Sequence, residues 1–213
     1  MGIFDLNEKS TIVNESFMGS NLYYIDNFYK TPDAIIDILN KTPSDLHHPT
    51  KEITPDTLNG IYFEDKRHVV KCEEILKVYD YLSTICGQPA TFANTFVITN
   101  QTKFNKDEFN NYKENYWYPH CDSGYNGLVY LNKNDDTCGT NLYKNIHHDE
   151  PIAEHIEPWR PKDNWEILKT IKPKFNRCVL FDGKIFPHGM HIPNERYFGE
   201  EYRLNQVFFF ADK

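Results

Sequence analysis

Tyr118-Pro119-His120-Cys121-Asp122 sets a histidine and an aspartate two residues apart near the middle of the 213-residue chain. On an extended strand alternate side chains share a face, so His120 and Asp122 are expected to point into one cavity. A second histidine from a neighbouring strand would complete two imidazoles and one carboxylate around a metal, and Phe186-Pro187-His188-Gly189 lies downstream. That ligand set is typical of redox-active iron. The sequence therefore predicts a redox metalloenzyme.

A rival pattern, His147-His148-Asp149, has the same spacing. It lies in a polar segment closed by a proline, which is typical of a surface loop. Asp122 is instead followed by a turn-rich segment and by Leu128-Val129-Tyr130-Leu131, whose composition predicts a buried strand. We therefore favour the pair His120 and Asp122.

The composition narrows the class of protein. A length of 213 residues, with 39% hydrophobic and 15% aromatic residues, suits one domain with a substantial core. The formal net charge of −8 argues against a nucleic-acid partner, because phosphate binding needs clustered Lys and Arg. The five cysteines form no CxxC pair and the N-terminus does not resemble a signal peptide, which predicts reduced thiols and a cytoplasmic location. No apolar run is long enough to cross a bilayer, so no membrane partner is expected.

Helices are expected before the β-rich part of the chain. Thr31-Pro32-Asp33-Ala34 has the pattern of a helix start, with proline at the first helical position. Apolar residues at three-and-four spacing predict a longer helix from about Val69 to Cys86, closed by Gly87. Before both lies Leu22-Tyr23-Tyr24-Ile25, which is rich in strand formers.

From Thr91 onward, strands separated by turns are expected. The clearest candidates are Phe92 to Thr99, Gly127 to Leu131, Gly139 to Lys144, Arg177 to Phe181 and Arg203 to Phe210. Helices followed by short strands predict a mainly β (α+β) fold, with helices of about residues 30–88 packed on a β-core of about residues 91–211, as in a β-sandwich or jelly roll. Pro158 to Pro173 is ambiguous, and its tryptophans Trp159 and Trp165 are read as core residues rather than a cap on the pocket.

The last expected strand carries an arginine at its start. Alternation places Arg203, Asn205, Val207 and Phe209 on one face. A guanidinium binds carboxylates through two parallel hydrogen bonds, so Arg203 is suited to hold an organic acid beside the metal. An internal ion pair with Asp or Glu is the alternative.

Residues Leu22 to Phe210 resemble the Fe(II)/2-oxoglutarate-dependent dioxygenases, in particular small stand-alone, prolyl-hydroxylase-like members. The resemblance rests on the order of His-x-Asp, a distant His and an Arg on the final strand. Tyr24-Ile25-Asp26-Asn27-Phe28 is similar to their opening strand, and Cys138-Gly139-Thr140-Asn141-Leu142-Tyr143 to their Gly-Gly-Thr strand.

The resemblance implies a double-stranded β-helix (cupin-like jelly roll) with Fe(II) held by His120, Asp122 and His188. It also implies that Arg203 pairs with the distal carboxylate of the cosubstrate 2-oxoglutarate. Dioxygen is the second cosubstrate, and hydroxylation with release of succinate and CO2 is the usual outcome. The primary substrate would be an amino acid, a peptide or protein side chain, or another small metabolite.

Several assignments within this resemblance remain open. His191 competes with His188 as the distal ligand, and Arg196 is a weaker substitute for Arg203. Asn205 stands where some members place a serine that helps bind the cosubstrate, and its amide can donate a similar hydrogen bond. The tyrosines considered for cosubstrate or substrate contact are Tyr112, Tyr116, Tyr118 and Tyr130, of which Tyr130 ranks highest because it lies on the strand next to the metal motif.

Two other classes of function compete with an oxygenase. One is a non-catalytic jelly-roll module that binds a metal or a ligand, because a fold does not fix a function. The other is a zinc hydrolase, since His and carboxylate ligands also suit zinc. Substrate specificity would depend on the loops at Gln101 to Trp117 and His147 to Asp163.

Overall fold

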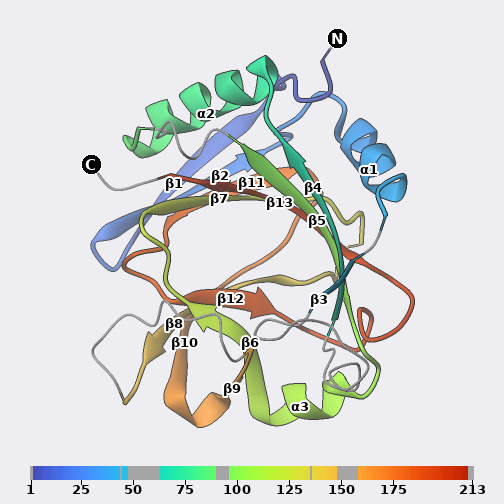
Figure 1. Cartoon of the computed structure of the whole chain (residues 1–213). Coiled ribbons are helices and arrows are strands. Elements are labelled where there is room, and N and C mark those ends of the chain that lie inside the picture. Colours follow the sequence, from blue (N-terminus) through green and yellow to red (C-terminus); the bar gives the residue numbers. More distant parts are fainter. Residues whose placement is uncertain are drawn as a thin grey trace.

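The computed structural model describes residues 2–43, 45–47, 63–89, 96–134, 136–147 and 158–210. Its strands form two antiparallel sheets that face each other (Figure 1). The larger sheet has the order β1 (Thr11–Phe17), β2 (Ser20–Asp26), β11 (Arg177–Asp182), β7 (Tyr125–Tyr130), β13 (Arg203–Phe209), β5 (Val97–Phe104), β4 (Phe63–Val70) and β3 (Asp45–His47). The smaller sheet has the order β10 (Trp165–Ile171), β8 (Gly139–Asn145), β12 (His188–His191), β6 (Asn115–His120) and β9 (Trp159–Pro161).

The helices lie outside this sandwich. Helices α1 (Pro32–Asn40) and α2 (Glu73–Cys86) lie on the outer side of the larger sheet, and α3 (Glu108–Glu114) lies beside the smaller one (Figure 1). A short 3-10 turn, η3 (Lys162–Asn164), leads into β10. No helix in the described ranges is both long enough and apolar enough to cross a membrane.

The main hydrophobic core lies between α2 and the larger sheet. Ile75, Val78 and Leu82 of α2 are fully buried in one cluster with Phe208 of β13. The alternate residues of β13 point to the inner side of the sheet, where they line a cavity: Arg203, Asn205, Val207 and Phe209. The predicted alternation of this strand is therefore confirmed, and it leaves the inner face available for a site.

The longer helix begins later than predicted. Val69 and Val70 belong to β4, where they pair with Ile98 and Val97, and α2 begins only at Glu73. The helical spacing was misleading because Val69, a β-branched residue at the end of a strand, fits the same apolar pattern. The predicted helix end is confirmed, since Gly87 caps α2 with a positive φ of 70°.

The other elements agree in position and differ in extent. The strands predicted near Leu22, Gly127, Gly139, Arg177 and Arg203 are all present, and α1 begins at Pro32 as expected. Strand β5 starts at Val97 and runs to Phe104, whereas residues 92–95 of its predicted range lie outside the described residues. The ambiguous segment from residue 158 to 173 contains β9, η3 and β10.

The N-terminal part is not a purely helical layer. Strands β3 and β4 lie within residues 30–88 and join the larger sheet, so the part of the chain expected to form helices also contributes strands. Strand β1 was missed because its side chains, Thr11 to Phe17, are mostly exposed at the sheet edge and lack an apolar face. The mainly β, antiparallel sandwich with few helices fits the expected fold class, while the double-stranded β-helix and the single domain stay predictions.

Candidate metal centre

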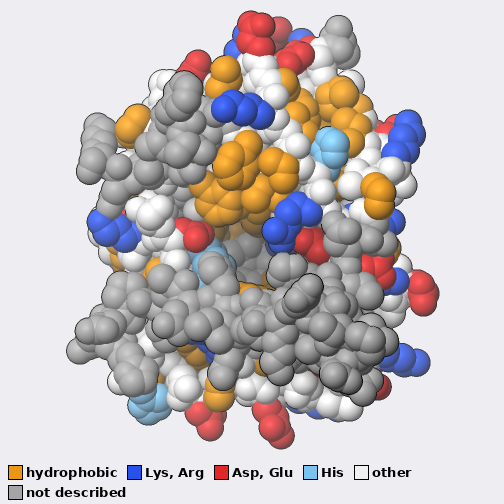
Figure 2. Space-filling model, in the orientation of Figure 1, with side chains coloured by type: hydrophobic (Ala, Val, Ile, Leu, Met, Phe, Trp, Pro, Cys, Tyr) orange, Lys and Arg blue, Asp and Glu red, His pale blue; other side chains and the backbone are white. Residues whose placement is uncertain are grey.

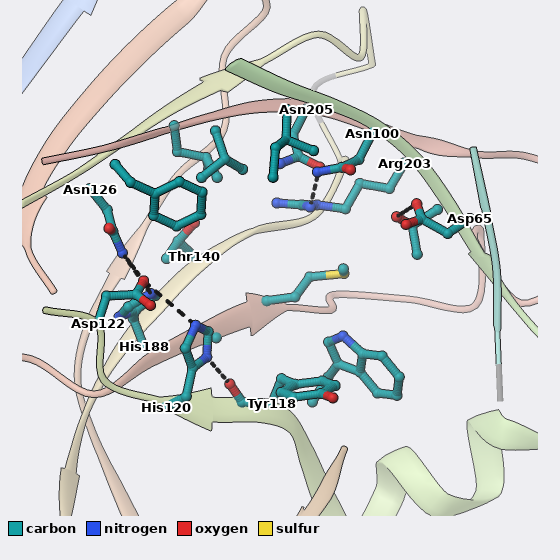
Figure 3. A pocket seen from close by; sticks show the side chains of 18 of the residues that line it. Asp65, Asn100, Tyr118, His120, Asp122, Asn126, Thr140, His188, Arg203 and Asn205 are labelled. Carbon is teal, nitrogen blue, oxygen red and sulfur yellow. Dashed lines mark hydrogen bonds and ion pairs between the residues drawn. The ribbon is translucent and has the colours of Figure 1, made fainter. Parts of the chain in front are cut away.

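A cavity of about 470 Å³ lies between the two sheets (Figure 3). All three predicted metal ligands, His120, Asp122 and His188, line it. Arg203 and Asn205 line it from the opposite sheet. The sandwich thus brings five of the six predicted site residues to one space.

The three predicted ligands lie close together. His120 ends β6, Asp122 follows two residues later, and His188 begins β12, which pairs with β6 so that the two histidines face each other. Their Nε2 atoms lie 3.7 and 3.2 Å, respectively, from Oδ2 of Asp122. One donor atom from each residue lies within 4.8 Å of the others, so the geometry allows the three side chains to bind one metal ion.

Backbone carbonyl groups fix both imidazole rings. Nδ1 of His120 lies 2.7 Å from the carbonyl oxygen of Tyr118, and Nδ1 of His188 lies 3.1 Å from that of Phe186. Because a carbonyl oxygen only accepts, each Nδ1 carries the proton of its hydrogen bond, which leaves each Nε2 as the ring nitrogen that faces the cavity. Histidines that bind metals usually donate their second ring N–H in this way.

These donor atoms fit a cation. Burial raises the pKa of Asp122, but its interactions with His188, His120 and Asn126 outweigh burial, and the pKa lies well below its ordinary value. Asp122 is therefore a carboxylate at neutral pH. Nε2 of His188 can donate a hydrogen bond to this carboxylate only when the imidazole carries protons on both nitrogens. When Nε2 has no proton, its lone pair faces the carboxylate oxygens, and a metal ion can bind both in place of the proton.

The backbone around β6 is shaped to present His120. Tyr118 has a positive φ of 53°, which is uncommon for a residue other than glycine, and its carbonyl group is the one that holds His120. The pairing between β6 and β12 also shifts register here. Gly189 allows the close approach, because a Cβ at that position would lie 2.5 Å from the carbonyl oxygen of Trp117.

Asn126 on β7 also contacts the ligands, and the sequence did not single it out. Its Nδ2 donates to Asp122 and lies 2.9 Å from Nε2 of His188 (Figure 3). Its Oδ1 is buried without a hydrogen-bond partner among the described residues. The alternation of β7, in which Asn126 shares a face with Leu128, could have indicated that it points into the same cavity.

Arg203 enters the cavity from the start of β13. The residue is only 7% exposed, and its Nη1 donates to Oδ1 of Asn205 at 2.7 Å (Figure 3). Its Nε is buried with no hydrogen-bond partner, and no carboxylate in the described parts of the chain forms an ion pair with it. The alternative of an internal ion pair is thus not found among these residues, and the guanidinium is left able to bind an anion.

Tyr130 lies behind the cavity rather than on its surface. It is fully buried, its hydroxyl group lies 2.9 Å from Oγ1 of Thr140, and Thr140 lines the cavity. Of the other tyrosines considered, only Tyr118 lines the cavity, whereas Tyr112 donates to the carbonyl group of Ile192.

The alternative residues lie elsewhere. His191 is three residues beyond His188 on β12, which turns it to the other face, and it is not part of the ligand cluster. Arg196 forms ion pairs with Asp136 and Glu201. His147 is exposed, and its partners in the rival pattern lie outside the described residues.

Strand β4 adds a second pair of charges that the sequence analysis missed. Asp65 and Arg67 line the cavity and bond each other, with Nη2 of Arg67 3.0 Å from Oδ2 of Asp65. Thr102 donates to the other carboxylate oxygen at 3.1 Å. The alternation in Phe63-Glu64-Asp65-Lys66-Arg67 was the available signal, but so polar a segment did not suggest a strand.

No protein-family model and no curated protein matches the chain. Among solved structures, it is similar to an oxidoreductase of the 2OG-Fe(II) oxygenase family from Burkholderia pseudomallei. The TM-score is 0.48 and the identity 11%, over 86% of this chain and 79% of that chain. With a similarity this distant, function has to be argued from the site.

Proposed function

We propose that the protein is a non-heme Fe(II)- and 2-oxoglutarate-dependent oxygenase, and that it hydroxylates its substrate. One observation carries the proposal: three metal-donor atoms face the same cavity as a buried guanidinium that has no carboxylate partner among the described residues. The two imidazoles and the carboxylate suit a metal ion, and the guanidinium suits an organic acid bound beside that metal.

In this proposal His120, Asp122 and His188 hold Fe(II), and Asn126 keeps the carboxylate of Asp122 oriented toward it. Three protein ligands leave positions for exogenous ligands. When bound, iron and 2-oxoglutarate supply the oxidising chemistry, in which dioxygen is consumed and succinate and CO2 are released.

Arg203 binds the distal carboxylate of 2-oxoglutarate through its unpaired Nε and a terminal nitrogen. Asn205 holds the guanidinium from the side through its Oδ1. Thr140 offers a hydroxyl group from the facing sheet, and Tyr130, predicted to contact the cosubstrate, acts through its hydrogen bond to Thr140. Burial of these groups excludes water from the anion and strengthens its pairing.

The test is an anaerobic titration of the protein with Fe(II) and 2-oxoglutarate, followed by admission of oxygen. We expect a visible charge-transfer band and then succinate. Asp122→Ala should abolish both, and His147→Ala, in an exposed loop, should retain them. A wild-type protein with neither band nor succinate would favour the non-catalytic binding module instead.

A further inference from the structure

Four apolar side chains form a continuous line across the inner face of the larger sheet. Val69 of β4 pairs with Ile98 of β5, Ile98 with Val207 of β13, and Val207 with Leu128 of β7. Residues in register on adjacent strands point to the same face of a sheet. We call these four residues the apolar stripe.

The apolar stripe is accessible. Ile98, Val207 and Leu128 line the cavity and are only partly buried, while Val69 is 57% exposed. Phe209, the next inward residue of β13, also lines the cavity and is partly buried. Figure 2 shows hydrophobic side chains gathered directly above the hollow in this face of the molecule. Exposed apolar surface of this kind commonly marks a binding site.

The apolar stripe ends at the metal ligands. Leu128 lies two residues along β7 from Asn126, which contacts both Asp122 and His188. The stripe therefore runs from the solvent-exposed edge at Val69 to the place where the proposed oxidation occurs.

Polar residues occupy the neighbouring rows of the same sheet. Next to the apolar stripe lies a row containing Asn100 and Asn205, which pair with each other, and beyond it Arg203 pairs with Thr102. The binding group for the cosubstrate is thus two rows away from the stripe. This separation leaves the apolar stripe as the surface for a second molecule.

The charges of the cavity are balanced. With both histidines counted as neutral metal ligands, the charged lining residues in the described part of the chain are Asp65, Arg67, Asp122 and Arg203. Two negative charges therefore face two positive ones. The carboxylate of Asp65 is already bonded by Arg67 and Thr102. Fe(II) and the dianion of 2-oxoglutarate add no net charge. A charged reacting group would therefore enter without a compensating partner, which is costly in a partly buried site.

We propose, on the basis of the proposed function, that the primary substrate lays an uncharged aliphatic or aromatic group along the apolar stripe, and that this group is hydroxylated. In the reaction one C–H bond becomes C–OH. One oxygen atom of O2 enters that product and the other enters succinate. The loss of CO2 from 2-oxoglutarate supplies the two further electrons required.

Matched probes test this inference. N-acetyl-leucinamide and N-acetyl-aspartic acid amide have similar shapes and differ in charge, as do N-acetyl-norleucinamide and N-acetyl-lysinamide. Each is added to the anaerobic complex with Fe(II) and 2-oxoglutarate, and the shift of the visible band and the succinate formed after oxygenation are measured. We expect the two uncharged probes to shift the band and raise succinate above the substrate-free rate, and the charged ones to do neither.

Variants locate the binding surface. Val207→Asp places a charge within the apolar stripe, and Val69→Asp does so at an exposed position where folding is not at risk. Losing the contact of one aliphatic side chain should weaken binding of the uncharged probes about tenfold in Val207→Asp, and by a smaller factor in Val69→Asp. Val13→Asp is the matched control, since Val13 is a 60% exposed strand residue of the same sheet.

The outcomes separate this inference from the proposed function. A normal band with no response to any uncharged probe, an equal response to charged probes, or unchanged probe binding in both stripe variants would overturn the inference alone. Absence of the band in the wild-type protein would overturn the proposed function. Ligand-observed NMR with the metal-free protein and the same four probes then still decides whether the apolar stripe selects uncharged groups.

Discussion

Replacing Arg203 tests the proposed role of the buried guanidinium most sharply. Arg203→Met keeps much of the side-chain volume and removes the charge. Hydrogen bonds to charged groups contribute about 1.5–3 kcal/mol each, so losing the pair to a carboxylate should cost about 3 kcal/mol of binding free energy or more. This corresponds to a roughly hundredfold or larger increase in the Kd for 2-oxoglutarate. Arg203→Lys retains the charge without the two-pronged geometry and should cost about tenfold.

The assay is a titration of 2-oxoglutarate into each anaerobic Fe(II)-loaded variant, followed through the visible band. Arg196→Met is the matched control, because Arg196 forms ion pairs with Asp136 and Glu201 away from the cavity. Its Kd should stay within about twofold of that of the wild type, a difference well under 1 kcal/mol.

Stability provides a second readout for the same variant. Arg203 is a buried cation with no ionic partner in the described parts of the chain, and such a charge opposes folding, so the melting temperature of the ligand-free protein should not fall in Arg203→Met. A Kd for 2-oxoglutarate unchanged from the wild type in Arg203→Met would refute the reasoning. A large loss of stability would instead show that contacts within the fold, such as the hydrogen bond from Arg203 to Asn205, outweigh the cost of burying the charge.

Three further predictions follow from individual contacts. His188→Ala should weaken metal binding by at least about tenfold, whereas His191→Ala, on the other face of the same strand, should leave the metal affinity measured by calorimetry unchanged. Gly189→Ala should lower both metal affinity and melting temperature, because its Cβ would meet a carbonyl oxygen of the neighbouring strand at 2.5 Å; wild-type values would contradict this close approach. Asp26→Asn should cost about 1–2 kcal/mol at pH 7, because Asp26 accepts two hydrogen bonds from Arg177. The hydrogen bonds from Arg177 are the main cause that lowers the pKa of Asp26 in the folded protein. In urea unfolding, the difference in stability between the wild type and Asp26→Asn should therefore be complete above about pH 4 and vanish as the pH falls through the folded-state pKa. A difference that does not change with pH would contradict this prediction.

The positions of several candidate site residues could be predicted because most of these residues lie on strands with simple alternation. The parity of β13 places Arg203 and Asn205 on the inner face, and the loop after β6 brings Asp122 to the same side as His120. Of the two histidines that the sequence left open as the distal ligand, His188 lies in the cluster with His120 and Asp122, and its role as a ligand stays a prediction.

Other features depend on contacts between distant segments. The orientation of His120 rests on the positive φ of Tyr118, which no local pattern marks. The sequence also does not show that Arg203 lacks a carboxylate partner on the strands that the structure describes, since that depends on which strands become neighbours. Asp65 and Arg67 were missed because a polar strand can be recognised only when its position in the sheet is known.

The central claim is that His120, Asp122 and His188 share one metal ion. Crystals grown anaerobically with Fe(II), measured on both sides of the iron absorption edge, test it directly. We expect one anomalous peak at bonding distance from Nε2 of both histidines and a carboxylate oxygen of Asp122. A cavity without such a peak, or iron bound only at another site, would contradict it.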